Sequence, residues 1–238
     1  MKRLLAMLLA LTMSAALTPC ARAGELAAPR TLTLIIDAGH GGEDGGAVSP
    51  NGLVESGVNL DIALRLERLI ALFGAPCVMT RDSEEIAYTA ETTRARKVED
   101  QKRRLKLIRD TENAVFLSIH QNKYTSGNPF GAQVLYAPTR GSEELGKDVQ
   151  NLLTATLEDG NRRAAARIQS EIYLMNNIDC PAVLVECAFL SNAREEALLQ
   201  TESYRLKLAV ILAAGYLHNR EMLEDIYFGE SENGVLLH

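Results

Sequence analysis

Short apolar runs rich in β-branched residues alternate along this chain with longer stretches in which apolar residues recur every three or four positions. The runs predict strands buried on both faces of a sheet, and the periodic stretches predict amphipathic helices. The predicted strands are 31–36, 75–80, 114–119, 131–136 and 181–185. The predicted helices are 58–73, 94–109, 142–157 and 195–218. This alternation predicts the α/β class, as a three-layer α/β/α sandwich around a mostly parallel mixed sheet.

The length of 238 residues and the even composition predict one globular domain, which the pattern places at residues 31–220. A linker at 24–30 is expected before it, and a C-terminal tail at 221–238 after it, because neither stretch has a clear period. The formal charge of −6 argues against a general affinity for nucleic acid.

Residues 1–23 have the features of a secretory signal peptide. Lys2 and Arg3 precede an apolar run from Leu4 to Leu17, and Ala21-Arg22-Ala23 is a small-x-small cleavage pattern. The run is shorter than the roughly 20 residues that span a bilayer, so we expect cleavage, with an uncleaved anchor as the alternative. The protein is therefore expected to be exported and to meet the membrane only through this segment.

After that segment is removed, three cysteines remain, namely Cys77, Cys180 and Cys187. Their odd number and the absence of a Cys-x-x-Cys spacing argue against a disulfide framework in this domain. We expect them to pack as small hydrophobic side chains.

The candidate chemistry lies where predicted strands end. His40 and His120 each follow such a strand in a polar or glycine-rich turn, Glu55 comes just before a predicted helix, and Glu186 follows the last strand. In an open α/β fold these ends meet at one edge of the sheet. Two imidazoles and a carboxylate form a recurring catalytic zinc shell with an open position for water, and a second carboxylate can accept the proton of that water.

The spacing alone leaves plainer interpretations open. A histidine after a strand is often only a hydrogen-bonded structural residue, and Glu186 could instead cap a helix. Asp37 and Asp44 are both candidates for the acceptor that orients an imidazole from outside the metal shell. The basic stretch from Arg94 to Arg109 is interpreted as a solvated helix face, with a patch for anionic wall polymers as the alternative.

Five stretches, in order, resemble the motifs of the zinc amidases called amidase type 3, the N-acetylmuramoyl-L-alanine amidases. They are Ile36-Asp-Ala-Gly-His-Gly-Gly42 with the following Asp44 to Ala47, Glu55 with Asn59-Leu60, Met79-Thr-Arg-Asp82, Ser118-Ile-His-Gln-Asn122, and Val185-Glu-Cys-Ala-Phe-Leu-Ser-Asn192. The resemblance covers Thr31 to about Leu217. Ala38 departs from the proline, and Ala188 from the glycine, that the family often has.

This resemblance implies that His40, Glu55 and His120 bind Zn²⁺ and that Glu186 is the catalytic carboxylate. It makes 31–220 a zinc amidase catalytic domain that cleaves the amide between N-acetylmuramic acid and L-alanine in peptidoglycan. The single domain and Ile172-Tyr-Leu-Met175 look most like the spore-cortex amidases. The expected location is then extracytoplasmic, in the cell wall or the spore intermembrane space.

Other interpretations remain at this stage. The same ligands could serve a zinc peptidase or deacetylase that acts on another cell-wall bond, or the chain could be a non-catalytic wall-binding protein. No recognisable wall-binding repeat accompanies the domain, so an activating partner protein is also considered as a source of targeting.

Overall fold

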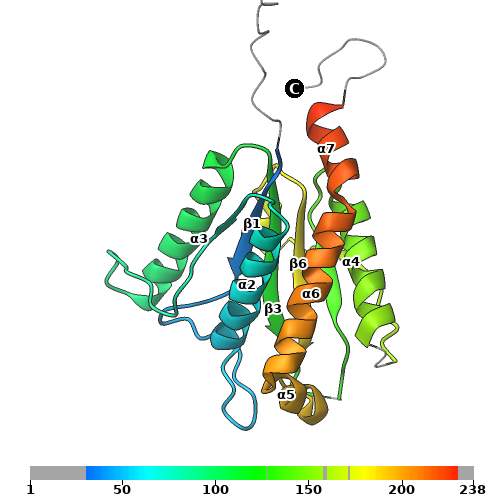
Figure 1. The fold of residues 1–238 in the computed structure, drawn as a ribbon. Helices are drawn as coiled ribbons and strands as arrows, with labels where there is room; N and C mark the ends of the chain where they lie inside the picture. Colours follow the sequence, from blue (N-terminus) through cyan, green and yellow to red (C-terminus); the bar gives the residue numbers. More distant parts are fainter. Residues whose placement is uncertain (1–30, 127, 158–159, 171, 230–238) are drawn as a thin grey trace, which may run out of the picture. The chain divides into compact units, whose positions relative to one another are not determined.

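The computed structural model describes residues 31–126, 128–157, 160–170 and 172–229. The predicted signal peptide and linker lie outside the described residues, as does the end of the predicted tail. The described chain forms a six-stranded mixed sheet with helices on both faces, which confirms the three-layer α/β/α prediction (Figure 1). Among the described residues, none of the helices has the length and apolar character needed to cross a bilayer.

The sheet brings the ends of three central strands to one edge. In sheet order the strands are β2 (Cys77–Met79), β1 (Thr33–Ala38), β3 (Ala114–Asn122), β6 (Ala182–Phe189), β4 (Gln133–Tyr136) and β5 (Ala166–Arg167). The first four are parallel, whereas β4 runs antiparallel to β6 and β5 runs parallel to β4. The carboxyl ends of β1, β3 and β6 therefore lie side by side.

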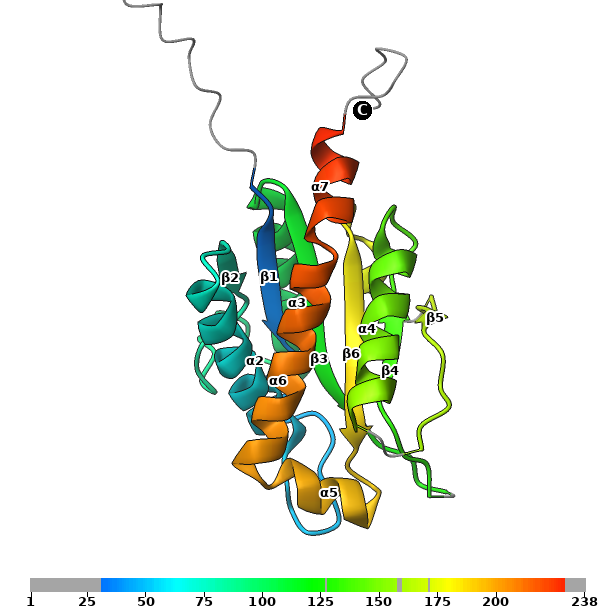
Figure 2. The ribbon, with the colours of Figure 1, turned by 45° about the vertical axis from the view of Figure 1, so that its right-hand side comes forward.

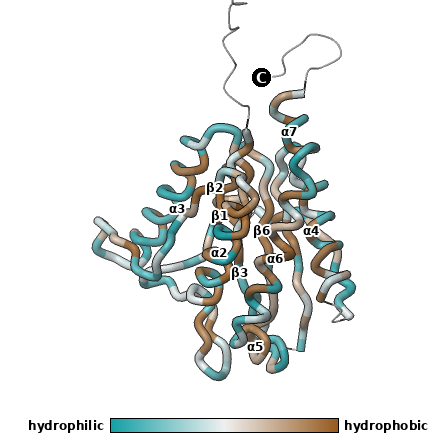
Figure 3. The backbone as a smooth tube through the Cα atoms, in the orientation of Figure 1, coloured by the Kyte–Doolittle hydropathy of each residue, from teal (hydrophilic) through white to brown (hydrophobic). Residues whose placement is uncertain are grey.

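Helices cover the sheet unequally. On one face lie α2 (Glu55–Leu72), α4 (Ser142–Leu157) and α6 (Glu202–His218), and on the other lie α3 (Thr93–Asp110) and the short 3₁₀ helix η2 (Leu174–Asn176) (Figure 2). Leu34 and Ile36 pack toward α2, whereas Ile35 between them packs toward α3. Because both faces are covered, the strands are continuous apolar runs, which Figure 3 shows at the centre of the fold.

Two differences from the sequence prediction lie at the carboxyl end. The single predicted closing helix is two helices, α5 (Ala193–Leu199) and α6, because the Thr201 side chain accepts a hydrogen bond from the Tyr204 amide and starts α6 anew. The predicted tail from residue 221 is corrected as far as Phe228, since α7 (Arg220–Phe228) is helical there and buries Leu223.

Cys180 and Cys187 are free and buried, and Cys77 is free and half-buried, as expected of packed thiols. Burial raises the pKa of Cys180 to about 12, with the charge of Asp179 adding to the effect. This thiol therefore stays protonated at neutral pH and is a poor nucleophile.

Candidate metal centre

The glycine-rich turn after β1 brings His40 close to two other candidate ligands. A Cβ atom at Gly39 would lie 2.4 Å from the His120 ring, and one at Gly46 would lie 2.5 Å from Glu55 Oε2. Only glycine leaves room at these positions. His40 itself adopts the left-handed backbone conformation, with φ 60°, which few residues other than glycine adopt.

His120 and Glu186 lie within strands rather than after them, which differs from the sequence prediction. β3 continues to Asn122 and β6 to Phe189, and His120 is the register partner of Glu186. Neighbouring residues in register project to the same face of a sheet, so both side chains point to the α3 side. Glu55 is the first residue of α2, which begins three positions before the predicted start at Val58.

The structure brings the three predicted metal ligands together. One ligand atom from each of His40, Glu55 and His120 lies within 4.8 Å of the others. Glu55 Oε1 is 3.3 Å from His40 Nε2 and 3.1 Å from His120 Nδ1, and the two rings meet edge to face with centroids 5.0 Å apart. Two imidazoles and a carboxylate around one point are a donor set that suits a divalent transition metal.

Glu55 is held as an anion. Its side chain accepts hydrogen bonds from the backbone amides of Ala47 at 2.8 Å and Gln121 at 3.0 Å, and from Asn59 Nδ2 at 3.3 Å. Burial alone would raise the pKa of Glu55, but hydrogen bonds and charges from His120 and His40 outweigh burial and lower the pKa below its usual range. The ionised carboxylate is the form in which glutamate binds a metal ion.

Asp44, rather than Asp37, contacts the candidate ligand His40. Asp44 Oδ2 lies 3.2 Å from His40 Nδ1, and Lys97 Nζ lies 3.1 Å from Asp44 Oδ1. Burial would lower the pKa of His40, but Glu55 and Asp44 outweigh burial and raise it. The contact fixes the orientation of the ring, as acceptors outside a metal shell do. The choice that the sequence left open is thus settled by geometry.

Asp37 instead anchors the base of the turn. It is buried, accepts hydrogen bonds from Ser118 Oγ at 2.6 Å and Thr80 Oγ1 at 2.7 Å, and forms an ion pair with Arg104. Burial would raise the pKa of Asp37, but the charge of Arg104 and the two hydroxyl donors lower it. Asp37 is therefore ionised and links β1 to β3, to α3 and to Thr80 just after β2.

Glu186 adds a carboxylate oxygen that has no partner among the described residues. Its Oε2 atom is buried and accepts no hydrogen bond from the described residues. Burial raises the pKa of Glu186; the charge of Glu55 adds to this effect, and those of His120 and His40 oppose it. A buried carboxylate oxygen without a partner is costly unless a ligand or water satisfies it. This oxygen fits a site that holds a cation and a water molecule.

A cleft with a volume of about 370 Å³ opens from the cluster along the α3 face of the sheet. Its lining includes Phe116, Leu184 and Glu186 from the sheet, Lys97 from α3, and Tyr173 from the segment before η2. The cleft thus combines apolar and titratable side chains, the usual composition of a ligand site.

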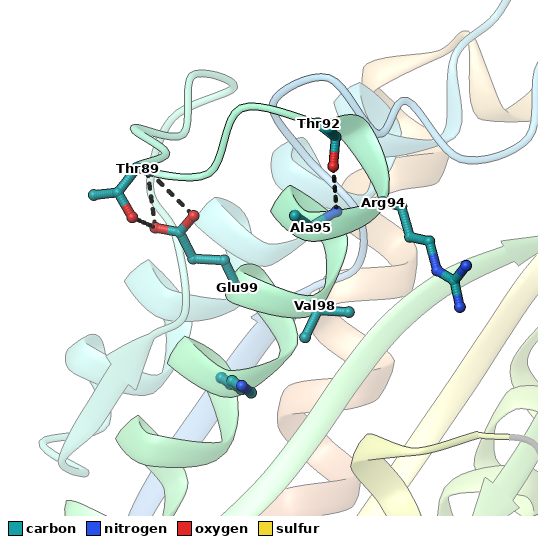
Figure 4. A pocket seen from close by; sticks show the side chains of 7 residues that line it. Thr89, Thr92, Arg94, Ala95, Val98 and Glu99 are labelled. Atoms are coloured by element: carbon teal, nitrogen blue, oxygen red, sulfur yellow. Dashed lines mark hydrogen bonds between the residues drawn. The ribbon is translucent and has the colours of Figure 1, made fainter.

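A second hollow lies along α3, beside its amino-terminal half (Figure 4). Thr92 accepts a hydrogen bond from the Ala95 amide and begins the helix, and Glu99 accepts hydrogen bonds from Thr89 at its rim (Figure 4). Its described lining includes neither histidine nor cysteine. The hollow is therefore not a second metal centre of the kind described above.

The basic stretch of α3 is mostly exposed, as predicted for a solvated helix face, and five of its basic side chains form ion pairs, of which only Arg104 is buried. The ion pairs are Arg96–Glu43, Lys97–Asp44, Arg103–Asp100, Arg104–Asp37 and Lys106–Asp110. The sequence analysis did not find the role of Arg104, because its partner lies 67 positions away and no local period indicates it. The only indication of this role in the sequence is the position of an arginine among apolar residues of a predicted helix.

Comparisons with known proteins agree with the geometry. Residues 34–217 match a family model described as N-acetylmuramoyl-L-alanine amidase. A germination-specific N-acetylmuramoyl-L-alanine amidase of Bacillus subtilis is 38% identical over 188 residues, which are 77% of this chain and 78% of that protein. The N-acetylmuramoyl-L-alanine amidase LytC of the same species is 32% identical, over 77% of this chain and 34% of that protein.

Among solved structures, the CwlD amidase from Clostridioides difficile, determined in complex with the GerS lipoprotein, superposes with a TM-score of 0.75. It is 35% identical in sequence, and the superposition covers 81% of this chain and all of that one. The likeness therefore extends over most of the described fold.

Proposed function

The chain belongs to the N-acetylmuramoyl-L-alanine amidase family, and from this premise we propose how its residues cleave peptidoglycan. His40, Glu55 and His120 hold Zn²⁺, and Glu186 moves the proton during hydrolysis of the amide between N-acetylmuramic acid and L-alanine. The observation that carries the proposal is the convergence of three donor atoms within 4.8 Å beside a carboxylate that has an unpartnered, buried oxygen.

Zinc suits this donor set, because two imidazole nitrogens and one carboxylate oxygen leave a coordination position open. When bound, Zn²⁺ supplies a Lewis acid that polarises the scissile carbonyl and lowers the pKa of water toward neutrality. The chain's own part is to keep Glu55 anionic through the Ala47 and Gln121 amides and to orient His40 through Asp44.

Glu186 is proposed as the general base and then the general acid. Oε2 accepts a proton from the attacking water, the water oxygen bonds to the lactyl carbonyl carbon, and the same proton passes to the L-alanine nitrogen as the C–N bond breaks. The products are a lactyl carboxylate on the glycan and a stem peptide with a free amino group. A raised pKa suits this exchange, because proton transfer is most efficient when the pKa of the carboxyl group is near the working pH.

The proposed setting is spore-cortex peptidoglycan outside the cytoplasm. The support is the germination-specific relative, which this chain matches over 78% of that protein's length, together with the signal-peptide pattern of residues 1–23. A spore amidase must act between membranes or in the wall, which requires export.

A partner protein is proposed as well, since the solved CwlD relative is bound to a lipoprotein. We expect the purified chain to bind zinc more weakly, and to turn over more slowly, than the chain with its partner. Full zinc loading and full activity in the isolated chain would contradict this part of the proposal.

The central test is digestion of purified cell-wall sacculi by the metal-replete protein. The expected products carry new N-terminal L-alanine, which mass spectrometry identifies. Glu186→Gln should retain zinc and lose at least about 100-fold in turnover, since general acid–base groups contribute on the order of 10²–10⁴. Release of sugar reducing ends alone, of acetate, or of peptides cut at another bond would exclude the amidase assignment.

A further inference from the structure

We propose that Arg81 and Arg104 are positioning residues for metal binding, whose guanidinium groups hold the backbone from Ala38 to His40 in the conformation that presents the His40 imidazole. The inference rests on the proposed metal site and extends it to two arginines that contact none of the three ligand side chains. Both arginines are only 5% exposed.

Arg81, in the loop after β2, donates hydrogen bonds from all three of its side-chain nitrogens to backbone carbonyls. Nε donates to the carbonyl oxygens of Ala38 at 3.0 Å and His40 at 2.8 Å, and Nη2 donates to that of Gly39 at 3.1 Å. Nη2 also donates to the Ser56 carbonyl at 2.8 Å, next to Glu55. One side chain therefore ties together the segments that carry two of the proposed ligands.

Arg104, on α3, reaches the same turn from the other side. Its Nη1 and Nη2 atoms donate to the Ala38 carbonyl at 3.1 Å and the His40 carbonyl at 2.6 Å. Asp37 and Asp100 pair with the same guanidinium and fix its orientation. The Ala38 and His40 carbonyls thus each accept from both arginines, so the backbone at His40 is restrained on two sides.

This arrangement is costly, which argues that it serves more than packing. Both guanidinium groups carry a positive charge into the protein interior, where the loss of hydration destabilises a charged group. Apolar side chains of similar volume usually fill a core at least as well as buried charges do.

The restrained residue is itself strained, which gives the arginines a purpose. His40 has a left-handed backbone, and such a conformation in a residue other than glycine persists only when its surroundings enforce it. The amides in the turn are also bonded, from Gly39 to Ile119, from Gly41 to Asp44 and from Gly42 to Glu84. Donors on both arginines and these amides together define one conformation before any metal arrives.

The test compares zinc affinity, measured by competition with a chromogenic chelator, for the wild type, Arg81→Lys and Arg104→Lys. Lysine keeps the charge but has one nitrogen, which cannot bond the same set of carbonyls. Arg205→Lys is the matched control, because Arg205 also pairs with an aspartate and donates to a carbonyl, that of Leu199, at 2.7 Å, far from the turn. The absorption spectrum of the Co²⁺-substituted proteins reports the coordination geometry independently of activity.

We expect the two test variants to bind zinc about 10- to 100-fold more weakly and to show an altered Co²⁺ spectrum, as outer-shell changes commonly do, while the control binds as the wild type does. Wild-type affinity in folded Arg81→Lys and Arg104→Lys would overturn the inference. If these variants do not fold, hydrogen exchange of the metal-free wild type decides, since the amides of Gly39, Gly41 and Gly42 should already be protected. Rapid exchange there would equally overturn it, whereas a wild type that binds no zinc would refute the proposed function itself.

Discussion

At the scale of single residues, the space around each glycine decides whether a larger side chain could replace it. Gly39 has no positive φ that would require glycine; it is constrained because the His120 ring occupies the space that a Cβ atom would need. Gly57, in the first turns of α2, has no neighbour closer than 3.4 Å to the Cβ position. A side chain is therefore excluded at Gly39 and tolerated at Gly57, although the sequence alone does not distinguish the two positions.

Gly39→Ala is expected to displace the His120 ring and to reduce both zinc affinity and turnover by at least about 10-fold, because misplaced ligands bind metal poorly. Gly57→Ala should leave both unchanged and stabilise the protein by about 0.5–1 kcal/mol, since alanine is the better helix former. Zinc titration and thermal melting of the two variants check this. Unaltered zinc binding by Gly39→Ala would show that the ring can move without cost.

At the scale of elements, the cleft lies between α3 and the segment that precedes and includes η2. Tyr173 lines the cleft and is 46% exposed, so its ring is accessible to a molecule bound there. An aromatic ring offers an apolar face to a sugar or a peptide at little entropic cost. We expect this segment to contact the substrate away from the bond that is cut.

Tyr173→Ala should raise KM about 5- to 10-fold and leave kcat nearly unchanged, because it removes an interaction that ground state and transition state share. Phe73→Ala is the control, since Phe73 is exposed and follows the end of α2, about 27 Å along the helix axis from Glu55. Steady-state kinetics on soluble muramoyl-peptide fragments separate the two constants. A fall in kcat with constant KM would place Tyr173 in the chemical step instead.

Elements with a strong period were predictable from the sequence, whereas those that depend on distant contacts were not. The runs around Ile35 and Phe116 predict buried strands because both faces are covered, and α4 follows from its apolar spacing. β5 has only two residues and exists through its pairing with β4, so no local pattern reports it. α7 was missed because its period is short, although Leu223 packs fully in the core.

The same division applies to the site. His40, Glu55, His120 and Glu186 could be proposed from residue type and from their places near strand ends, and the structure brings them together. Their catalytic and metal-binding roles stay predictions. Arg104 could not be proposed in the same way, because it bonds carbonyl oxygens and any residue supplies a carbonyl, whereas Arg81 lies in one of the five stretches that resemble the family's motifs.

At the scale of the whole molecule, one buried ion pair connects the sheet to α3. Asp37 lies on β1, Arg104 lies on α3, and Ser118 on β3 donates to the same carboxylate. The surface pair that Asp61 forms with Arg65 and Arg205 is a useful contrast, because Asp61 is 35% exposed and also has a lowered pKa. Solvent screens the surface pair, so it should contribute less than about 1 kcal/mol.

The stability of the metal-free protein should therefore fall in acid, partly because of Asp37. Its folded-state pKa is lowered, so its stabilising effect is complete above the unfolded-state pKa of about 3.9 and is lost as the pH falls through the folded-state value. Asp37→Asn leaves the buried Arg104 charge with Asp100 as its remaining carboxylate partner among the described residues, and it should cost about 3–5 kcal/mol at pH 7. The melting temperature should drop by roughly 6–20 °C at about 2–4 °C per kcal/mol, with a shallower decline between pH 5 and pH 2. Asp61→Asn should shift it by about 4 °C or less, and parallel pH curves for the wild type and Asp37→Asn would show that the buried pair does not govern acid stability.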